Sequence, residues 1–143
     1  MSRHTARIHA FNLIYQFPFH FDWDKSRVDD YLESLPDLED LIQGLDPDDN
    51  DRTFIINETL GTHTNLQEFD SLISDNLKEW ELDRIAKVDL ALLRLALYEI
   101  RYAEDISTAT AINEAVEIAK LYGTDDSPSF VNGLLGQVVR SNG

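Results

Sequence analysis

The stretch "VDLALLRLALYEI" at residues 88–100 is apolar on nearly every side of a helix, with Arg94 and Glu99 as its exceptions. A helix that is hydrophobic all round is buried by neighbouring elements on several sides. The stretch therefore predicts a central, buried helix. Because an unpaired buried guanidinium is very costly, Arg94 is predicted to form a structural ion pair, with Glu114 or Glu117 as its candidate partner.

Helical spacing of apolar residues continues on both sides of this stretch, and strand signals are nearly absent. Prolines, glycines and capping residues divide the chain into about seven helices joined by short turns. The expected helices are 2–17, 26–35, one ending near Gly61 with Phe54, Ile56 and Leu60 inward, 66–77, 88–100, 107–123 and one beginning at Ser127-Pro128, and residues 38–45 carry a further short apolar stripe. The fold class is all-α. Two small helical subdomains, about 1–78 and 79–143, that share the central helix fit this pattern.

The composition limits the classes of function. The chain has 143 residues, of which 27 are acidic and 12 basic, and its formal charge is −15. Contacts with phosphates need Lys and Arg, so the overall charge argues against binding a polyanion and favours a basic partner. The absence of cysteine excludes disulfides and thiol chemistry. With no apolar stretch of membrane length and no cleavable leader pattern, a cytoplasmic protein is expected.

No arrangement of residues typical of a catalytic site stands out. The chain has four histidines, and none has a second ligand at a recognised metal-binding spacing. It has no glycine-rich phosphate loop and no Gly-x-Ser-x-Gly motif. Carboxylate pairs are expected by chance in so acidic a chain, where they form a solvated face. The sequence therefore predicts neither an enzyme nor a cofactor or metal site.

Positive charge gathers at the front of the chain, in "SRHTARIHAFNLIYQF" at residues 2–17. Arg3 and Arg7 are four residues apart and project from the same side of a helix, with His4 beside them. This pattern fits a small cationic patch for phosphate contacts, and it also fits solubilising charge near a frayed terminus. The stretch alone favours the second interpretation.

Two residues near the last helix are also notable. Phe130 follows a helix start and is either a core residue or an exposed stacking platform, and its residue type favours the core. Gly133 lies inside a helical pattern, where glycine lowers helix stability. Close approach of another helix is the expected reason for this glycine.

Five blocks of the sequence are informative together: "WELDRIAKVDLALLRLALYEI" (80–100), "AINEAVEIAKLYG" (111–123), "DSPSFVNGLLG" (126–136), the opening "TARIHAFNLIYQF" and "HTNLQEFDSLISDNLKEW". These blocks resemble the NusB family of transcription antitermination factors. The resemblance covers essentially the whole chain and is least diagnostic at 18–50. It implies two packed helical bundles and a binding role without catalysis. Members of the family pair with NusE, a small-subunit ribosomal protein, and the pair binds boxA RNA of nascent transcripts within a modified RNA polymerase complex, notably on ribosomal RNA operons.

The resemblance also implies roles for individual residues. Arg3 and Arg7, with His4 beside them, match the arginine-rich segment that contributes to RNA binding, and Phe130 matches an aromatic position near the RNA-binding face. Single-stranded RNA is bound by phosphate neutralisation together with stacking on planar groups. Asp89 and Asp126 match acidic positions assigned to the NusE side, where they suit a basic partner. Some relatives self-associate, so a homodimer is a further expectation.

The chain departs from the family pattern in ways that affect RNA binding. It has only two arginines at its front, and Ser129 stands where a lysine is often found. Fewer cations predict weaker intrinsic RNA affinity and a flatter salt dependence, so that a basic partner would supply the missing charge. Two other functions stay open. One is an RNA-docking module of the kind found in some ribosomal RNA methyltransferases, and the other is a purely structural protein-interaction bundle.

Overall fold

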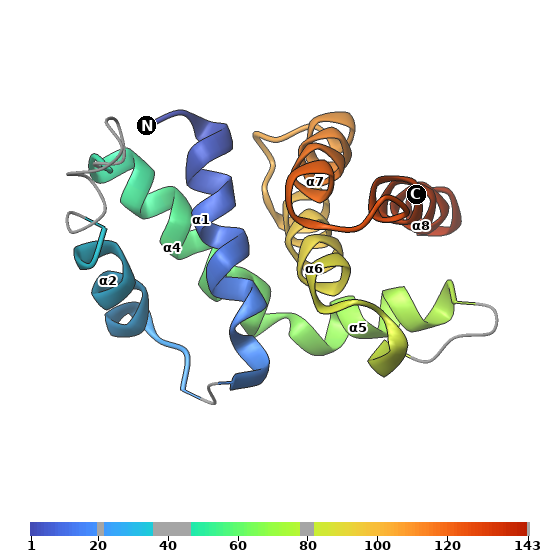
Figure 1. Ribbon diagram of the computed structural model, residues 1–143, viewed down its shortest axis with the longest axis horizontal. Helices are drawn as coiled ribbons and strands as arrows, with labels where there is room; N and C mark the ends of the chain where they lie inside the picture. The colour runs from blue at the N-terminus through green and yellow to red at the C-terminus, as the bar shows by residue number, and fades with distance from the viewer. Residues whose placement is uncertain (20–21, 36–46, 78–81, 143) are drawn as a thin grey trace. The chain divides into compact units, whose positions relative to one another are not determined.

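The computed structural model describes residues 1–19, 22–35, 47–77 and 82–142. These residues form seven α-helices and two short 3-10 helices (Figure 1). The α-helices are α1 (Arg3–Tyr15), α2 (Lys25–Glu33), α4 (Asp49–Thr64), α5 (Leu66–Asp75), α6 (Lys87–Tyr102), α7 (Thr108–Tyr122) and α8 (Ser127–Asn142), and the 3-10 helices are η1 (Phe17–Phe19) and η2 (Leu82–Arg84). The all-α prediction is confirmed. The apolar stretch expected at 38–45 lies outside the described residues.

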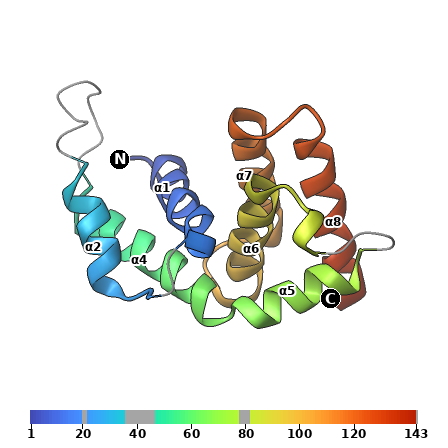
Figure 2. The same cartoon turned by 60° about the horizontal axis from the view of Figure 1, so that its bottom comes forward.

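The chain divides into two compact units, Met1–Thr64 and Asn65–Gly143. In the first unit, α4 contacts both α1 and α2 (Figure 1). In the second unit, α6, α7 and α8 pack against one another, and α5 contacts α6 and α8 (Figure 2). This division groups α5 with the second unit, whereas the sequence suggested a boundary near residue 78. Helix α5 joins the second unit through its own apolar side, on which Phe69 and Ile73 are fully buried.

Side-chain caps define where several helices begin. The Ser2 hydroxyl accepts a hydrogen bond from the Thr5 amide at the start of α1. The Ser107 hydroxyl accepts a hydrogen bond from the Thr110 amide at the start of α7, where the sequence predicted a helix start. Helix α2 begins after Asp24 rather than at Ser26, because the Asp24 carboxylate accepts a hydrogen bond from the Arg27 amide. Such caps satisfy amides that have no partner inside the helix.

The segment that was expected to be buried on several sides forms most of α6. All residues from Ala91 to Leu97 are buried, including Arg94. The Arg94 guanidinium donates from Nε and Nη2 to the two carboxylate oxygens of Asp70 on α5, at 2.8 and 2.9 Å. The predicted partners Glu114 and Glu117 are therefore wrong. The actual partner lies 24 residues earlier in the chain, on the helix that packs against α6.

A tight connection between α7 and α8 sets the start of the last helix. The Thr124 amide donates to the Ser127 hydroxyl over 3.0 Å. A Cβ atom on Gly123 would lie 2.5 Å from the Cβ of Ser127, closer than real Cβ contacts, so only glycine fits this position. The connection thereby fixes the first turn of α8, which carries Phe130.

Candidate functional site

Two arginines of α1 share one aromatic ring. The guanidinium carbon of Arg3 lies 4.3 Å from the centre of the Phe54 ring on α4, and that of Arg7 lies 5.4 Å from it. Both distances fall within the range of cation–π attraction. The two side chains differ in exposure, because Arg3 faces solvent whereas Arg7 is only 3% exposed. The predicted pair therefore consists of one accessible and one buried cation.

The α1 segment that carries these arginines is itself positively charged. His4 follows Arg3 in the first turn of α1 and is half-buried. The first acidic residue of the chain is Asp22, well beyond the end of α1. The segment therefore has a local charge opposite in sign to the net charge of −15. An anion that approaches Arg3 meets no carboxylate on α1 itself.

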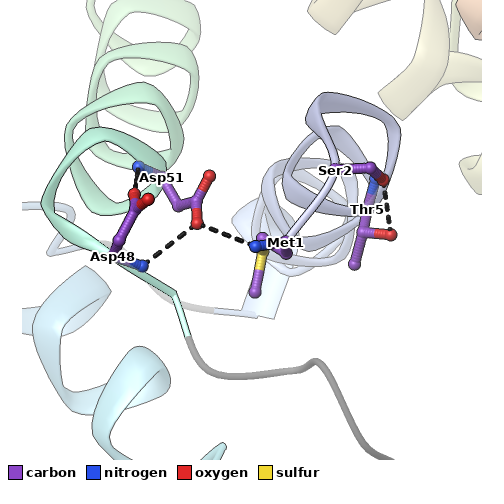
Figure 3. Close-up of polar contacts among 5 residues, drawn as sticks. All are labelled: Met1, Ser2, Thr5, Asp48 and Asp51. Atoms are coloured by element: carbon purple, nitrogen blue, oxygen red, sulfur yellow. Dashed lines mark hydrogen bonds and ion pairs between the residues drawn. The ribbon is translucent and has the colours of Figure 1, made fainter.

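The start of α1 is tied to α4 by a buried carboxylate (Figure 3). The terminal ammonium group of Met1 donates to Oδ2 of Asp51 over 3.1 Å, and the Asp48 amide donates to the same oxygen over 3.0 Å. Burial acts to raise the pKa of Asp51, but these hydrogen bonds and the ammonium charge outweigh it and hold that pKa below its ordinary value. Together with the Ser2 cap, these contacts order a segment that the sequence treated as a frayed end.

A hollow of about 790 Å³ lies in the second unit, and it is lined largely by apolar surface. The end of α5, η2, the start of α6 and the first half of α8 form its walls. We call it the α8 hollow, and the lining residues that matter here are Arg84, Asp89, Asp126, Phe130, Gly133 and Leu134. It therefore unites three residues that the sequence singled out, Asp89, Asp126 and Phe130.

The polar groups of the α8 hollow differ in exposure. Asp89 is 7% exposed, and its Oδ1 has no hydrogen-bond partner among the residues that the structure describes. Asp126 and Arg84 are exposed, and the Phe130 ring is half-buried. A buried carboxylate oxygen accepts hydrogen bonds and is costly to leave without one. The hollow thus combines an exposed carboxylate, Asp126, with the partly accessible Phe130 ring, while Oδ1 of Asp89 is buried in its wall.

Gly133 lies on the exposed side of α8, in the wall of this hollow. A Cβ atom added to it would meet nothing within 4 Å in the described part of the chain. The expectation that another helix approaches this glycine is therefore wrong. Its lack of a side chain instead leaves the α8 backbone open towards solvent.

The structure places the predicted site residues in two groups. Arg3, His4 and Arg7 lie together at the start of the first unit, and Asp89, Asp126 and Phe130 lie together in the second. Two further residues of these groups escaped sequence reasoning. Phe54 follows the apolar spacing of a core residue, and its contact with the Arg3 guanidinium is evident only in the structure. Arg84 is an exposed cation that lines the same hollow as Phe130, and no local motif indicates this.

Neither group contains the elements of a metal or membrane site. Within residues 1–19, 22–35, 47–77 and 82–142, no cluster of three histidine, aspartate or glutamate side chains could hold a metal ion. The helices formed by these same residues are each too short or too polar to span a membrane. The two groups consist of cations, carboxylates and the aromatic rings of Phe54 and Phe130, which are suited to interactions through charge, hydrogen bonds and stacking.

Comparisons with known proteins identify the family. The model of the NusB family matches residues 4–140. The transcription antitermination protein NusB of Acetivibrio thermocellus is 41% identical over 140 residues, which cover 98% of this chain and 90% of the relative. The protein of the same name from Agathobacter rectalis is 39% identical, with 96% and 98% of the two chains covered.

Solved structures agree with this match. A structure of T. maritima NusB superposes with a TM-score of 0.78 at 34% identity and covers 98% of this chain and 92% of that one. A complex of the antitermination factors NusB and NusE with dsRNA contains a chain of the same fold, with a TM-score of 0.78, 19% identity and coverage of 97% and 96%. The chain belongs to the NusB family of transcription antitermination proteins.

Proposed function

We propose that this chain is a non-catalytic transcription antitermination factor of the cytoplasm. In this role it binds boxA-type single-stranded RNA of nascent transcripts, notably those of ribosomal RNA operons, together with a NusE-type ribosomal protein and within an antiterminating RNA polymerase complex. Its family membership supports the class of function. The NusB–NusE complex with dsRNA supports the two kinds of partner, because its NusB-fold chain matches nearly the whole of this one.

The observation that carries the RNA part is the exposed guanidinium of Arg3 in a segment without acidic residues. Arg3 would contact phosphate, with His4 and the buried Arg7 beside it on α1. Phe130 would supply a ring for base stacking, since its half-buried position leaves part of the side chain accessible. Phosphate contact and stacking are the two components that single-stranded RNA binding requires.

The protein partner would use the acidic groups of the α8 hollow. Asp126 offers an exposed charge, and Asp89 adds a largely buried charge whose Oδ1 lacks a partner within the described structure. A basic ribosomal protein offers both donors and positive charge. Complementary charge of this kind speeds docking and disfavours wrong partners. A basic partner would also compensate for the few cations that this chain itself brings to RNA.

A gel shift with boxA-containing RNA and with a scrambled RNA of equal length tests this proposal, each with and without purified NusE. We expect preferential binding of the boxA RNA and a clear gain in affinity when NusE is present. Equal binding of both RNAs, or no gain from NusE, would contradict it. Sedimentation of the free protein at the same concentrations shows whether a homodimer forms and dissolves when NusE binds.

A second candidate function is a protein-interaction module with weak intrinsic RNA binding. The net charge of −15 and the buried acceptor in the α8 hollow favour it. A pull-down of NusE by this chain, with and without RNA, separates the two functions. Capture that does not depend on RNA, together with no RNA binding by the resulting pair, would favour the module over the RNA-binding factor.

A further inference from the structure

We propose that Phe54 is a positioning residue for RNA binding, because its ring holds the Arg3 guanidinium in place for a phosphate. The inference rests on the proposed function and adds to it a residue on α4 that carries no charge. The observation behind it is the distance of 4.3 Å between the guanidinium carbon and the centre of the ring. An exposed arginine is otherwise free to sample many rotamers, and it must lose that freedom when it binds.

The geometry leaves the useful part of the guanidinium available. A guanidinium attracted to a ring uses its face, whereas its N–H donors lie in its plane. In the described parts of the chain, the Arg3 side chain makes no hydrogen bond or ion pair that would occupy these donors. A phosphate can therefore accept two parallel hydrogen bonds from a group whose position is already set.

A second contact of α4 supports the same segment. Asp51 lies three residues before Phe54 on α4, so the two side chains project from neighbouring positions on one face of that helix. Asp51 binds the Met1 ammonium group, and Phe54 lies against Arg3 and Arg7. One face of α4 thus holds both the backbone start of α1 and its first cation. Because Arg7 is buried against the same ring, the outward phosphate contact falls to Arg3.

The first unit contains a matched control for this arrangement. The guanidinium carbon of Arg27 lies 5.5 Å from the centre of the Trp23 ring, so it too is an arginine beside an aromatic residue. Its Nε, however, already donates to the backbone oxygen of Asp22 over 2.6 Å. Aspartates also surround it, including Asp24 at the cap of its own helix. Arg27 is therefore expected to take no part in RNA binding.

The test compares four variants for binding to boxA RNA in the presence of NusE at low salt, with circular dichroism as the check of folding. Arg3→Ala and Phe54→Leu are each expected to weaken binding by about three- to tenfold, on the scale of a single cation–π or phosphate contact. Phe54→Tyr keeps a ring and should bind like the wild type. Arg27→Ala removes the same charge as Arg3→Ala elsewhere in the unit and should also bind like the wild type.

The double variant Arg3→Ala with Phe54→Leu separates positioning from general packing. If the ring acts through Arg3, the double variant binds no more weakly than Arg3→Ala alone. If the two losses multiply, or if Phe54→Leu binds as well as the wild type while Arg3→Ala does not, the inference is overturned and the proposed function stands. A wild type that does not prefer boxA RNA overturns both.

Two measurements keep the inference testable should Phe54→Leu fold poorly. Arg3→Lys keeps the charge but not the planar donors, so we expect weaker binding with an unchanged salt dependence, and wild-type affinity for this variant would contradict the inference. In the free protein, the ring current of Phe54 should shift the NMR signals of the Arg3 side chain upfield. Arg3 signals at ordinary positions would show that the side chain is not held.

Discussion

The two units of the molecule present their binding groups in opposite ways. The first unit exposes a cation, Arg3, in front of an aromatic ring and within a segment without acidic residues. The second unit buries an anion, Asp89, in the wall of an apolar hollow beside Phe130. The net charge of −15 describes neither arrangement. The proposed binding of an anionic and of a basic partner is compatible with one acidic chain, because each would depend on local charge, exposure and neighbouring rings.

The two units also hold their groups in place differently. Arg3 depends on a contact between α1 and α4, whereas the α8 hollow depends on the packing of α5, α6 and α8. Each binding activity should therefore respond to changes within its own unit. Variants that alter one unit and leave the other unchanged test this independence.

The largest effect on the second unit should come from the ion pair between α5 and α6. Asp70→Ala leaves the buried Arg94 without its carboxylate, and we expect the free energy of unfolding to fall by about 3 kcal/mol. Denaturation in urea, followed by circular dichroism, measures the loss. Glu117→Ala is the control, because it breaks only an exposed pair with Lys120 and should cost no more than about 0.5 kcal/mol. Equal losses in the two variants would show that the buried pair does not stabilise the unit.

The two arginines of α1 should differ in how much each contributes to stability and to RNA binding. Arg7→Ala removes a buried side chain and should lower the free energy of unfolding by about 2 kcal/mol. Arg3→Ala removes an exposed one and should change it by less than about 0.5 kcal/mol, while it weakens RNA binding. Thermal denaturation and an RNA titration of both variants provide the measurement. If Arg3→Ala destabilised the protein as much as Arg7→Ala, the division into one accessible and one structural cation would be wrong.

Much of the fold could be predicted from local signals. The apolar spacing of residues 88–100 gave the buried helix, and Ser107 gave a helix start, because both depend on residues within a few turns of one another. The partner of Arg94 could not be predicted in this way. Asp70 lies on a different helix, and the sequence gives no reason to prefer it to Glu114 or Glu117 of α7. Only the packing of the helices shows which carboxylate lies against Arg94.

The candidate site shows the same limit. The resemblance predicted Arg3, Asp89 and Phe130 as site residues, but it predicted neither the ring against Arg3 nor the hollow around Asp89. Phe54 is 51 residues from Arg3, and its apolar spacing is that of any half-buried residue of α4. Physical proximity between distant segments decides which residues cooperate, and periodicity within one segment carries no information about it.

Gly133 gives a test in which stability and binding should change in opposite directions. Gly133→Ala places a methyl group in open space within α8, so the better helix propensity of alanine should raise the free energy of unfolding by about 1 kcal/mol. If a partner approaches the open backbone at the α8 hollow, the same methyl group should weaken NusE binding. Thermal denaturation and calorimetric titration with NusE measure the two effects. Stronger or unchanged NusE binding would show that the partner does not approach this part of α8.

The smallest expected effect is a pH dependence of stability in the first unit. All four histidines of the chain lie in this unit, within the first 64 residues. Burial lowers the pKa of His9, whose Nδ1 shares a hydrogen bond of 2.8 Å with the Tyr31 hydroxyl. The unfolded chain, in which histidine has a pKa of about 6.5, therefore binds this proton more readily than the folded one.

Stability should consequently fall as the pH drops below about 6.5, by less than about 1 kcal/mol between pH 7 and 5.5. Hydrogen exchange at these two pH values should show faster opening in the first unit, while the second unit, which has no histidine, stays unchanged. His9→Gln should remove most of this pH dependence even if it lowers stability at both values, because the slope depends only on the titrating group. A slope that persists in this variant would assign the effect to another group, with His63 next, since burial lowers its pKa too.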